Sequence, residues 1–220
     1  MISSTYIQNI TDRVKTILYD AEAGHDWLHI SRVLNNAVLI SDAEPSCQKE
    51  IVILAALLHD IADSKFQAGD EEIGLRVAAN IMIECNVPEH IKKEVILIIQ
   101  NISFKGGFTN SEYDSLELDI VRDADRLDAI GAIGIARAFT YGGYKNRRLY
   151  DAAISPVMYE DKESYKHSKA PTINHFYEKL LKLKALMQTN KGKQMAEERH
   201  KFMLEYLDHF HTETGLSPFK

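Results

Sequence analysis

The chain has 220 residues, of which 45% are hydrophobic and 26% are charged, and its formal net charge is -6. These values are typical of a globular protein with one large domain or two small ones. The negative charge and the lack of a long basic run argue against nonspecific nucleic-acid binding and against a membrane-surface role.

The cysteine and hydropathy patterns predict a cytoplasmic protein. Cys47 and Cys85 stand in no CxxC pair, so we expect neither a disulfide framework nor a thiolate zinc site. The first residues have no basic and apolar segments of the kind found in signal peptides. The longest apolar run, around residues 51–58, is too short to cross a bilayer, so no membrane span is expected.

Apolar residues recur at helical spacing along most of the chain, and no convincing strand pattern appears. In chain order, the expected helices are about 3–20, 27–41 and 47–59, then one capped by Asp70 and one that begins at 88. They are followed by helices at 115–128, from about 133 to 142–143, at 172–188 and at 191–211. Residues 143–170 are polar and irregular, which predicts a long surface segment and a candidate lid. The fold class is therefore expected to be all-α.

The apolar helix expected at 47–59 ends abruptly in the doublet His59-Asp60, which Asp63 and Lys65 follow. A charge buried without a partner is costly, so polar groups at a core boundary normally pair or bind a metal. Imidazole nitrogen together with carboxylate oxygen suits divalent ions such as Mn, Fe, Zn or Ni. The doublet therefore predicts a metal site, which needs further ligands from other parts of the chain.

A second polar group lies at the start of the helix expected at 27–41. His29 and Arg32 are three residues apart and share a helix face, as do His25 and His29 if the helix begins early. Asp26 can cap this helix. His25 and Asp26 are therefore candidates for supporting the metal ligands, although each could serve only at the start of the helix.

A third polar group, Asp123–Asp128, alternates acids with apolar residues inside an amphipathic helix. Together with Asp125 of this group, His29 and the doublet His59-Asp60 resemble the H…HD…D signature of the HD-domain metal-dependent phosphohydrolases. His29 matches the first ligand in the context H-x-x-R-V, and Asp125 matches the last in A-D-R-L. The similarity to small bacterial stand-alone HD proteins continues through Gly24–Val33, Ile102–Gly106, Asp123–Phe139 and Asn174–Leu183.

The resemblance implies an HD-type helical bundle formed by a single domain, 1–220. Its core would span about 25–130, and the C-terminal helices at about 172–211 would pack on that core. It also implies one divalent metal ion, held by His29, His59, Asp60 and Asp125. Manganese is the favoured ion, and Mg, Fe, Co, Ni and Zn are alternatives.

The chemistry of such a site predicts roles for the acids around the doublet. A bound divalent metal can lower the pKa of its water from 15.7 toward ~7 and can polarise a phosphoryl oxygen. Asp63, four residues after His59, is the candidate for orienting or deprotonating this water, and Asp60 is expected to contribute to catalysis as well. Related hydrolases of signalling nucleotides carry an acidic pair here, whereas this chain has Ala62 before Asp63.

Several cations and one further histidine are candidates for binding substrate phosphates, because Arg offers bidentate contacts and Lys a compact charge. These candidates are Arg32, Lys65, Lys105, Arg126, Lys179 and His175. Three of them have a simpler alternative. Arg126 could form only intrahelical pairs, Lys179 could be an ordinary surface lysine, and His175 could belong to the core.

The resemblance implies a phosphohydrolase that acts on a small phosphorylated substrate. A nucleotide is the favoured substrate, with pyrophosphate released from nucleoside or deoxynucleoside triphosphates. A nucleoside monophosphate phosphatase is the alternative within enzymology. A catalytically inactive nucleotide-sensing protein with a structural metal is the alternative outside it. Neither nucleic acid nor membrane is an expected partner, and the oligomeric state is left open.

Overall fold

The computed structural model describes residues 5–19, 21, 26–61, 71–102, 113–157, 169–217 and 219. Within these ranges every regular element is a helix and there is no strand, as expected for an all-α fold. The chain divides into a first compact unit, Met1–Phe104 with Asn110–Asp125, and a second, Lys105–Thr109 with Arg126–Lys220. The single domain expected for 1–220 stays a prediction.

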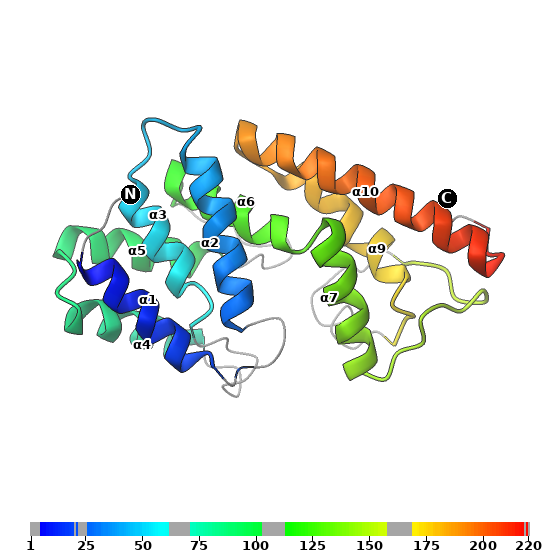
Figure 1. Ribbon diagram of the computed structural model, residues 1–220, viewed down its shortest axis with the longest axis horizontal. Coiled ribbons are helices and arrows are strands. Elements are labelled where there is room, and N and C mark those ends of the chain that lie inside the picture. The colour runs from blue at the N-terminus through cyan, green and yellow to red at the C-terminus, as the bar shows by residue number, and fades with distance from the viewer. Residues whose placement is uncertain are drawn as a thin grey trace. The chain divides into compact units, whose positions relative to one another are not determined.

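The first unit is built around one helix that is apolar on nearly all sides. Its helices are α1 (Thr5–Ile17), α2 (Trp27–Ser41), α3 (Lys49–Leu58), α4 (Glu71–Glu84), α5 (Glu89–Ile102) and most of α6 (Leu116–Asp128). α3 packs against α1, α2 and α5 (Figure 1). A helix with no polar face has to be surrounded by others, so α3 forms the centre of this core.

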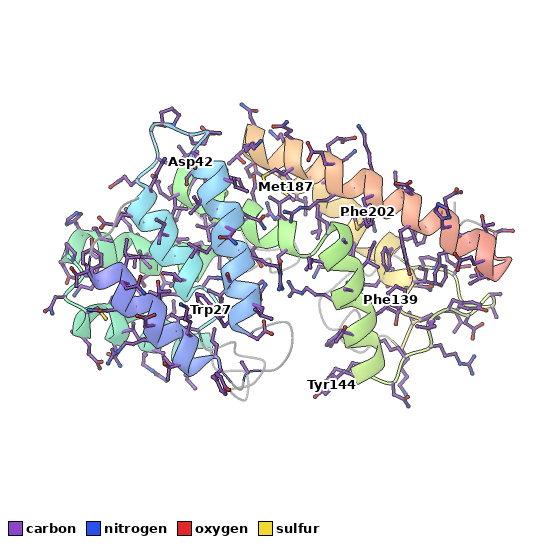
Figure 2. The ribbon with its side chains drawn as sticks, in the orientation of Figure 1. Trp27, Asp42, Phe139, Tyr144, Met187 and Phe202 are labelled. Carbon is purple, nitrogen blue, oxygen red and sulfur yellow. The ribbon has the colours of Figure 1, made fainter. Side chains whose placement is uncertain are left out.

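The ends of α2 are those expected from the sequence. Asp26 precedes the helix in an extended conformation, and its side chain accepts a hydrogen bond of 2.9 Å from the backbone N–H of His29. This bond satisfies one of the amide groups that a helix start leaves without a partner. Figure 2 labels Trp27 at the first turn and Asp42 after the last. The cap therefore fixes the turn that carries His29.

An aromatic cluster holds the second unit together. Its helices are α7 (Gly131–Tyr144), α9 (Asn174–Glu178), the 3-10 helix η1 (Leu180–Leu186) and α10 (Asn190–Thr214). The ring of Phe139, labelled in Figure 2, has its centroid 5.9 Å from that of Phe176, 6.2 Å from Tyr206 and 6.3 Å from Phe210. Since these partners come from α9 and α10, the cluster joins three helices.

The single helix expected at 172–188 is wrong, because two shorter helices occupy this range. Between α9 and η1, Lys179 has φ -139° and ψ -58°, which is outside the helical region. Leu180, Leu183 and Leu186 recur at every third residue. This interval matches the 3.0 residues per turn of a 3-10 helix, and over so short a stretch it resembles an α-helical stripe.

The irregular segment expected around 143–170 begins directly after α7. Residues 145–157 and 169–173 contain no helix. The backbone N–H of Thr172 donates to the carbonyl of Arg148 at 2.9 Å, and that of Ile173 donates to Leu149 at 3.1 Å. Residues 158–168 lie outside the described residues, so the lid stays a prediction. In the described ranges, no helix has both the length and the apolar character needed to cross a membrane.

Candidate metal centre

His59 lies at the C-terminal end of α3, where the apolar helix carries it into the interior. Its side chain is 2% exposed. The ring Nδ1 atom lies 2.9 Å from the carbonyl oxygen of Ala56, and because a carbonyl only accepts, Nδ1 must carry the proton. The Nε2 atom is buried and has no hydrogen-bond partner among the described residues. His59 thus offers Nε2 in the form that binds metals, with the other nitrogen fixed.

His29, from the first turn of α2, faces His59 across the site. The two rings meet edge to face, with centroids 5.4 Å apart. The Nε2 atom of His29 lies 3.5 Å from Oδ2 of Asp60 and 3.6 Å from Oδ1 of Asp125. The Nε2 atom of His59 lies 3.9 Å from each of the same two oxygens. The two imidazoles and the two carboxylates therefore converge.

The backbone of α6 brings Asp125 to this point. The Asn36 side chain donates a buried hydrogen bond of 3.1 Å to the carbonyl of Ala124, the residue before Asp125. One turn earlier, the guanidinium of Arg122 donates to the carbonyl of Asn101, with the Nη2 bond at 2.7 Å. These bonds tie α6 to α2 and to α5. The position of Asp125 thus depends on residues that do not themselves touch the site.

The burial of the four side chains gives the site an inner and an outer side. His29 and His59 are each 2% exposed, whereas Asp60 is 25% and Asp125 is 42% exposed. The imidazoles therefore occupy the desolvated interior, where a charged group would be costly. The carboxylates lie on the side that a substrate and water can reach.

The distances between these atoms fit a divalent ion. His29, His59 and Asp125 each offer one ligand atom, and these atoms lie within 4.8 Å of one another. Two ligand atoms at ~2.1 Å from one ion would lie ~3.0 Å apart at a right angle and ~4.2 Å apart on opposite sides. The distances of 3.5 to 3.9 Å between nitrogen and oxygen fall within this range. The donor set suits a borderline or hard divalent metal.

Comparison with known proteins agrees with this geometry. The sequence model of the HD domain matches residues 27–130, which include all four of these side chains. The chain is 38% identical to YpgQ of Bacillus subtilis over 203 residues, 91% of this chain and 89% of YpgQ. This chain belongs to the HD-domain superfamily of hydrolases. HD domains bind divalent metals, and the cluster just described contains residues that could hold one.

Solved structures place this HD protein among similar folds. A crystal structure of an HD-superfamily hydrolase from Bacillus thuringiensis has a TM-score of 0.76 and 41% identity, covering 97% of this chain and 98% of that one. The structure of Bacillus subtilis YpgQ in complex with ADP has a TM-score of 0.74 and 35% identity, with 95% of each chain covered. The similarity therefore extends over almost the whole chain, beyond the HD segment.

Four of the remaining candidates lie outside the described residues. This is the case for His25, Asp63, Lys65 and Lys105, whose roles stay predictions. Asp26 caps α2 at the N–H of His29 and in this way supports a candidate ligand through its backbone. Arg32 follows His29 by three residues in α2, is half-buried, and so starts from the same face of the helix.

The other three candidates belong to the second unit of this HD protein. The Arg126 guanidinium donates to the carbonyl of Leu186, at the end of η1. His175 is half-buried at the start of α9, and Lys179 follows that helix. Burial, and then the positive charges of Lys179 and Arg147, lower the pKa of His175 to about 3. His175 is therefore neutral at pH 7, and all three substrate roles stay predictions.

Two acids near Asp125 are buried. Asp123 is 0% exposed and Asp128 is 1% exposed. The Arg137 guanidinium forms an ion pair with Asp128, which provides the partner that a buried carboxylate needs. No periodicity could have indicated this pair, because the chain turns at Gly131, where φ is +76°.

One histidine outside the site is also buried. His211 of α10 is 5% exposed, and its Nε2 atom lies 2.7 Å from the hydroxyl of Tyr177. The side chain is covered because the aromatic rings of α9 and α10 pack around it, with Phe210 among them.

Proposed function

We propose that this HD protein is a metal-dependent phosphohydrolase that acts on a small phosphorylated molecule, a nucleotide. The observation that carries the proposal is the buried Nε2 atom of His59, which has no hydrogen-bond partner among the described residues and faces His29 and two carboxylates. A buried acceptor left in this state is costly unless something binds it. A divalent metal would satisfy it.

In this proposal, the metal ligands are His29, His59, Asp60 and Asp125. Asp60 is included because its Oδ2 atom lies 3.5 Å from Nε2 of His29, similar to the 3.6 Å for Asp125. Manganese is the proposed ion, since mixed nitrogen and oxygen ligands suit it. When bound, such an ion activates a water molecule and polarises a phosphoryl group.

The protein's own residues would hold the metal, act on the attacking water and bind the substrate phosphates. The two histidines would hold the metal from the desolvated side, and the more exposed carboxylates would hold it from the side open to substrate. We propose that Asp63 orients or deprotonates the attacking water, with help from Asp60. The substrate phosphates would be bound by Arg32, Lys65, Lys105, Arg126, Lys179 and His175.

The choice of a nucleotide as substrate rests on the complex of Bacillus subtilis YpgQ with ADP, a protein 35% identical to this one over nearly its whole length. Within that class, we propose that pyrophosphate is released from nucleoside or deoxynucleoside triphosphates. An alternative activity on nucleoside monophosphates would release orthophosphate instead, so the products separate the two.

The test is a panel of nucleoside mono-, di- and triphosphates assayed with Mn, Mg, Co and Ni, in which orthophosphate and pyrophosphate are read separately. We expect pyrophosphate from triphosphates, with bound metal and turnover both lost in His59→Ala and in Asp60→Ala. His209→Ala, which removes an exposed histidine of α10, serves as the control and should behave as wild type. Metal-dependent hydrolysis that survives in His59→Ala would refute the proposal, and a metal-loaded protein inactive on the whole panel would indicate a nucleotide sensor.

A further inference from the structure

Two hydrogen bonds link α6 to the ends of two other helices of the first unit. The backbone N–H of Gln48, the residue before α3, donates to the Glu117 carboxylate at 2.8 Å. The Arg122 guanidinium donates to the carbonyl of Asn101 in the last turn of α5, with the Nη2 bond at 2.7 Å and the Nε bond at 3.2 Å. All of these residues, and Asp125 itself, belong to the first unit. α6 is therefore linked to its own core at two points before Asp125.

Both bonds satisfy backbone groups that a helix end leaves without an intrahelical partner. Asn101 is the next-to-last residue of α5, where a positive guanidinium also suits the helix dipole. Glu117 accepts from the N–H that precedes α3, as a glutamate inside the helix does in a capping box. The simplest role of Glu117 and Arg122 would therefore be to cap α3 and α5. The position of Asp125 indicates a second role.

The side chain of Asp125 has little packing of its own. It is 42% exposed, yet its Oδ1 atom lies 3.6 Å from Nε2 of His29 and 3.9 Å from Nε2 of His59. A carboxylate that solvent reaches on one side is held mainly by the backbone that carries it. A metal site requires ligand distances within about 0.2 Å of their usual values. The backbone of α6 at Asp125 therefore has to be placed with similar accuracy.

Apolar burial holds α6 in the core but gives it no directional restraint. Leu118, Val121 and Ala124 are each 0% exposed. The free energy gained by burying such side chains depends on area and has no preferred direction, whereas hydrogen bonds require particular distances and angles. The bonds of Glu117 and Arg122 to backbone groups of other helices supply this restraint.

The two bonds also connect α6 with α3, the helix that ends just before His59. One of them binds the residue that directly precedes α3, and α5, which the other binds, packs against α3. Arg122 is three residues before Asp125, so its bond lies one helical turn from that carboxylate. The carbonyl just before Asp125 accepts from Asn36 of α2, the helix that carries His29. Asp125 is thus held relative to both helices that supply the histidines.

We propose that Arg122 is a positioning residue, which fixes α6 one turn before Asp125 so that this carboxylate stays where the metal requires it. Glu117 has the same role, with a smaller effect, at the start of the helix. This inference rests on the proposed metal-dependent function and adds two residues that have no proposed contact with the metal. Groups that orient metal ligands change metal affinity or activity by about 10-fold to 100-fold when they are removed. A residue that only caps α5 would leave the metal affinity of the folded protein unchanged.

The test measures Mn²⁺ binding to the full metal-free chain by calorimetry, together with the melting temperature. Arg122→Met keeps the aliphatic stem and removes both donors, and Arg122→Lys keeps the charge without the fork. The matched control is Arg13→Met, which removes an ion pair with Glu84 between α1 and α4 of the same unit. Because Arg122 acts through the backbone, we expect the lower end of the range. The Mn²⁺ dissociation constant should rise about 10-fold in Arg122→Met, rise less in Arg122→Lys and stay unchanged in Arg13→Met.

Glu117→Ala extends the test to the start of α6 and should raise the Mn²⁺ dissociation constant by a smaller factor than Arg122→Met. Wild-type binding in Arg122→Met, or an equal loss in Arg13→Met, would overturn the inference. If Arg122→Met does not fold, wild-type binding in both Arg122→Lys and Glu117→Ala would overturn it instead.

His59→Ala separates such an outcome from a failure of the proposed function. If His59→Ala loses Mn²⁺ while the Arg122 and Glu117 variants bind it normally, only the positioning role is wrong. If His59→Ala itself binds Mn²⁺ normally, the metal site is wrong and the positioning role falls with it.

Discussion

The Nε2 atom of His29 lies 3.6 Å from the Oδ1 atom of Asp125, although the two residues come from α2 and α6. Each is held through its backbone. The Asp26 cap fixes the turn that carries His29, and the bond from Asn36 fixes the carbonyl just before Asp125. The site is therefore sensitive both to its own side chains and to these supports.

Metal removal should lower the stability of the protein. A ligand that binds only the folded state at 100 times its dissociation constant contributes ~2.7 kcal/mol. We expect Mn²⁺ to raise the melting temperature of the wild type by several degrees, and a chelator to reverse the shift. His59→Ala should show no shift, while His209→Ala should respond like the wild type. Thermal unfolding with and without Mn²⁺ provides the measurement.

Asp63→Asn should keep the metal and lose rate. If Asp63 acts on the attacking water, its loss should lower kcat by roughly 10² to 10⁴, the usual contribution of a general base. The Mn²⁺ dissociation constant should stay within about twofold of the wild-type value, because Asp63 is not a proposed ligand. Steady-state kinetics measures kcat, and calorimetry measures the Mn²⁺ dissociation constant. An unchanged kcat would show that Asp63 does not act on the attacking water.

Asn36→Leu should destabilise the protein and weaken the site. The substitution removes the buried hydrogen bond that Asn36 adds to the carbonyl of Ala124, and such a bond contributes ~0.5–1.5 kcal/mol to the free energy of unfolding. Urea titration measures this loss. Leu204→Ala, at a position of α10 that is 47% exposed, is the control, for which a change of less than ~0.5 kcal/mol is expected. Full stability of Asn36→Leu would show that the hydrogen bond contributes little.

His175 should make the protein less stable in acid. Its pKa is lowered to about 3 in the folded state, chiefly by burial, from an ordinary value of 6.5. Between these values the unfolded chain binds the proton and the folded chain does not, so stability falls as the pH decreases through this window. The limiting slope is ~1.4 kcal/mol per pH unit for one proton.

His175→Gln removes this titration and should therefore flatten the decline between pH 6 and pH 4. Urea titrations at several pH values give the slopes for the wild type and for the variant. The exposed His209 provides the comparison, because His209→Gln should leave the slope unchanged. Equal slopes in the wild type and in His175→Gln would mean that His175 titrates normally.

Local patterns in the sequence were enough to predict most helices. Both ends of α2 were correct, because Asp26 provides a cap and the apolar stripe begins just after it. The all-α fold followed from the same local patterns, whereas the HD family came from the resemblance of His29, His59-Asp60 and Asp125 to the HD signature. The helix predictions did not need such distant residues. These predictions succeeded because they depend on neighbours within one or two helical turns, which the sequence places directly.

The sequence did not predict the break at Lys179, because the prediction relied on the local spacing of apolar residues, and that spacing is similar in the two kinds of helix. A three-residue interval in Leu180, Leu183 and Leu186 satisfies both a 3-10 and an α-helical reading, and only the backbone angles distinguish them. Intrinsic preferences are weak next to packing, so local sequence could not decide between the two.

The amino-acid sequence by itself determined which residues could bind a metal and on which helices they lie. Only the tertiary structure decided that Nε2 of His59 is the buried and unsatisfied nitrogen, that Asp128 is buried against Arg137, and that Arg122 binds the end of α5. Each of these depends on contacts between segments far apart in the chain. Such contacts form because the whole set of apolar faces must be buried together, which no single stretch of sequence specifies.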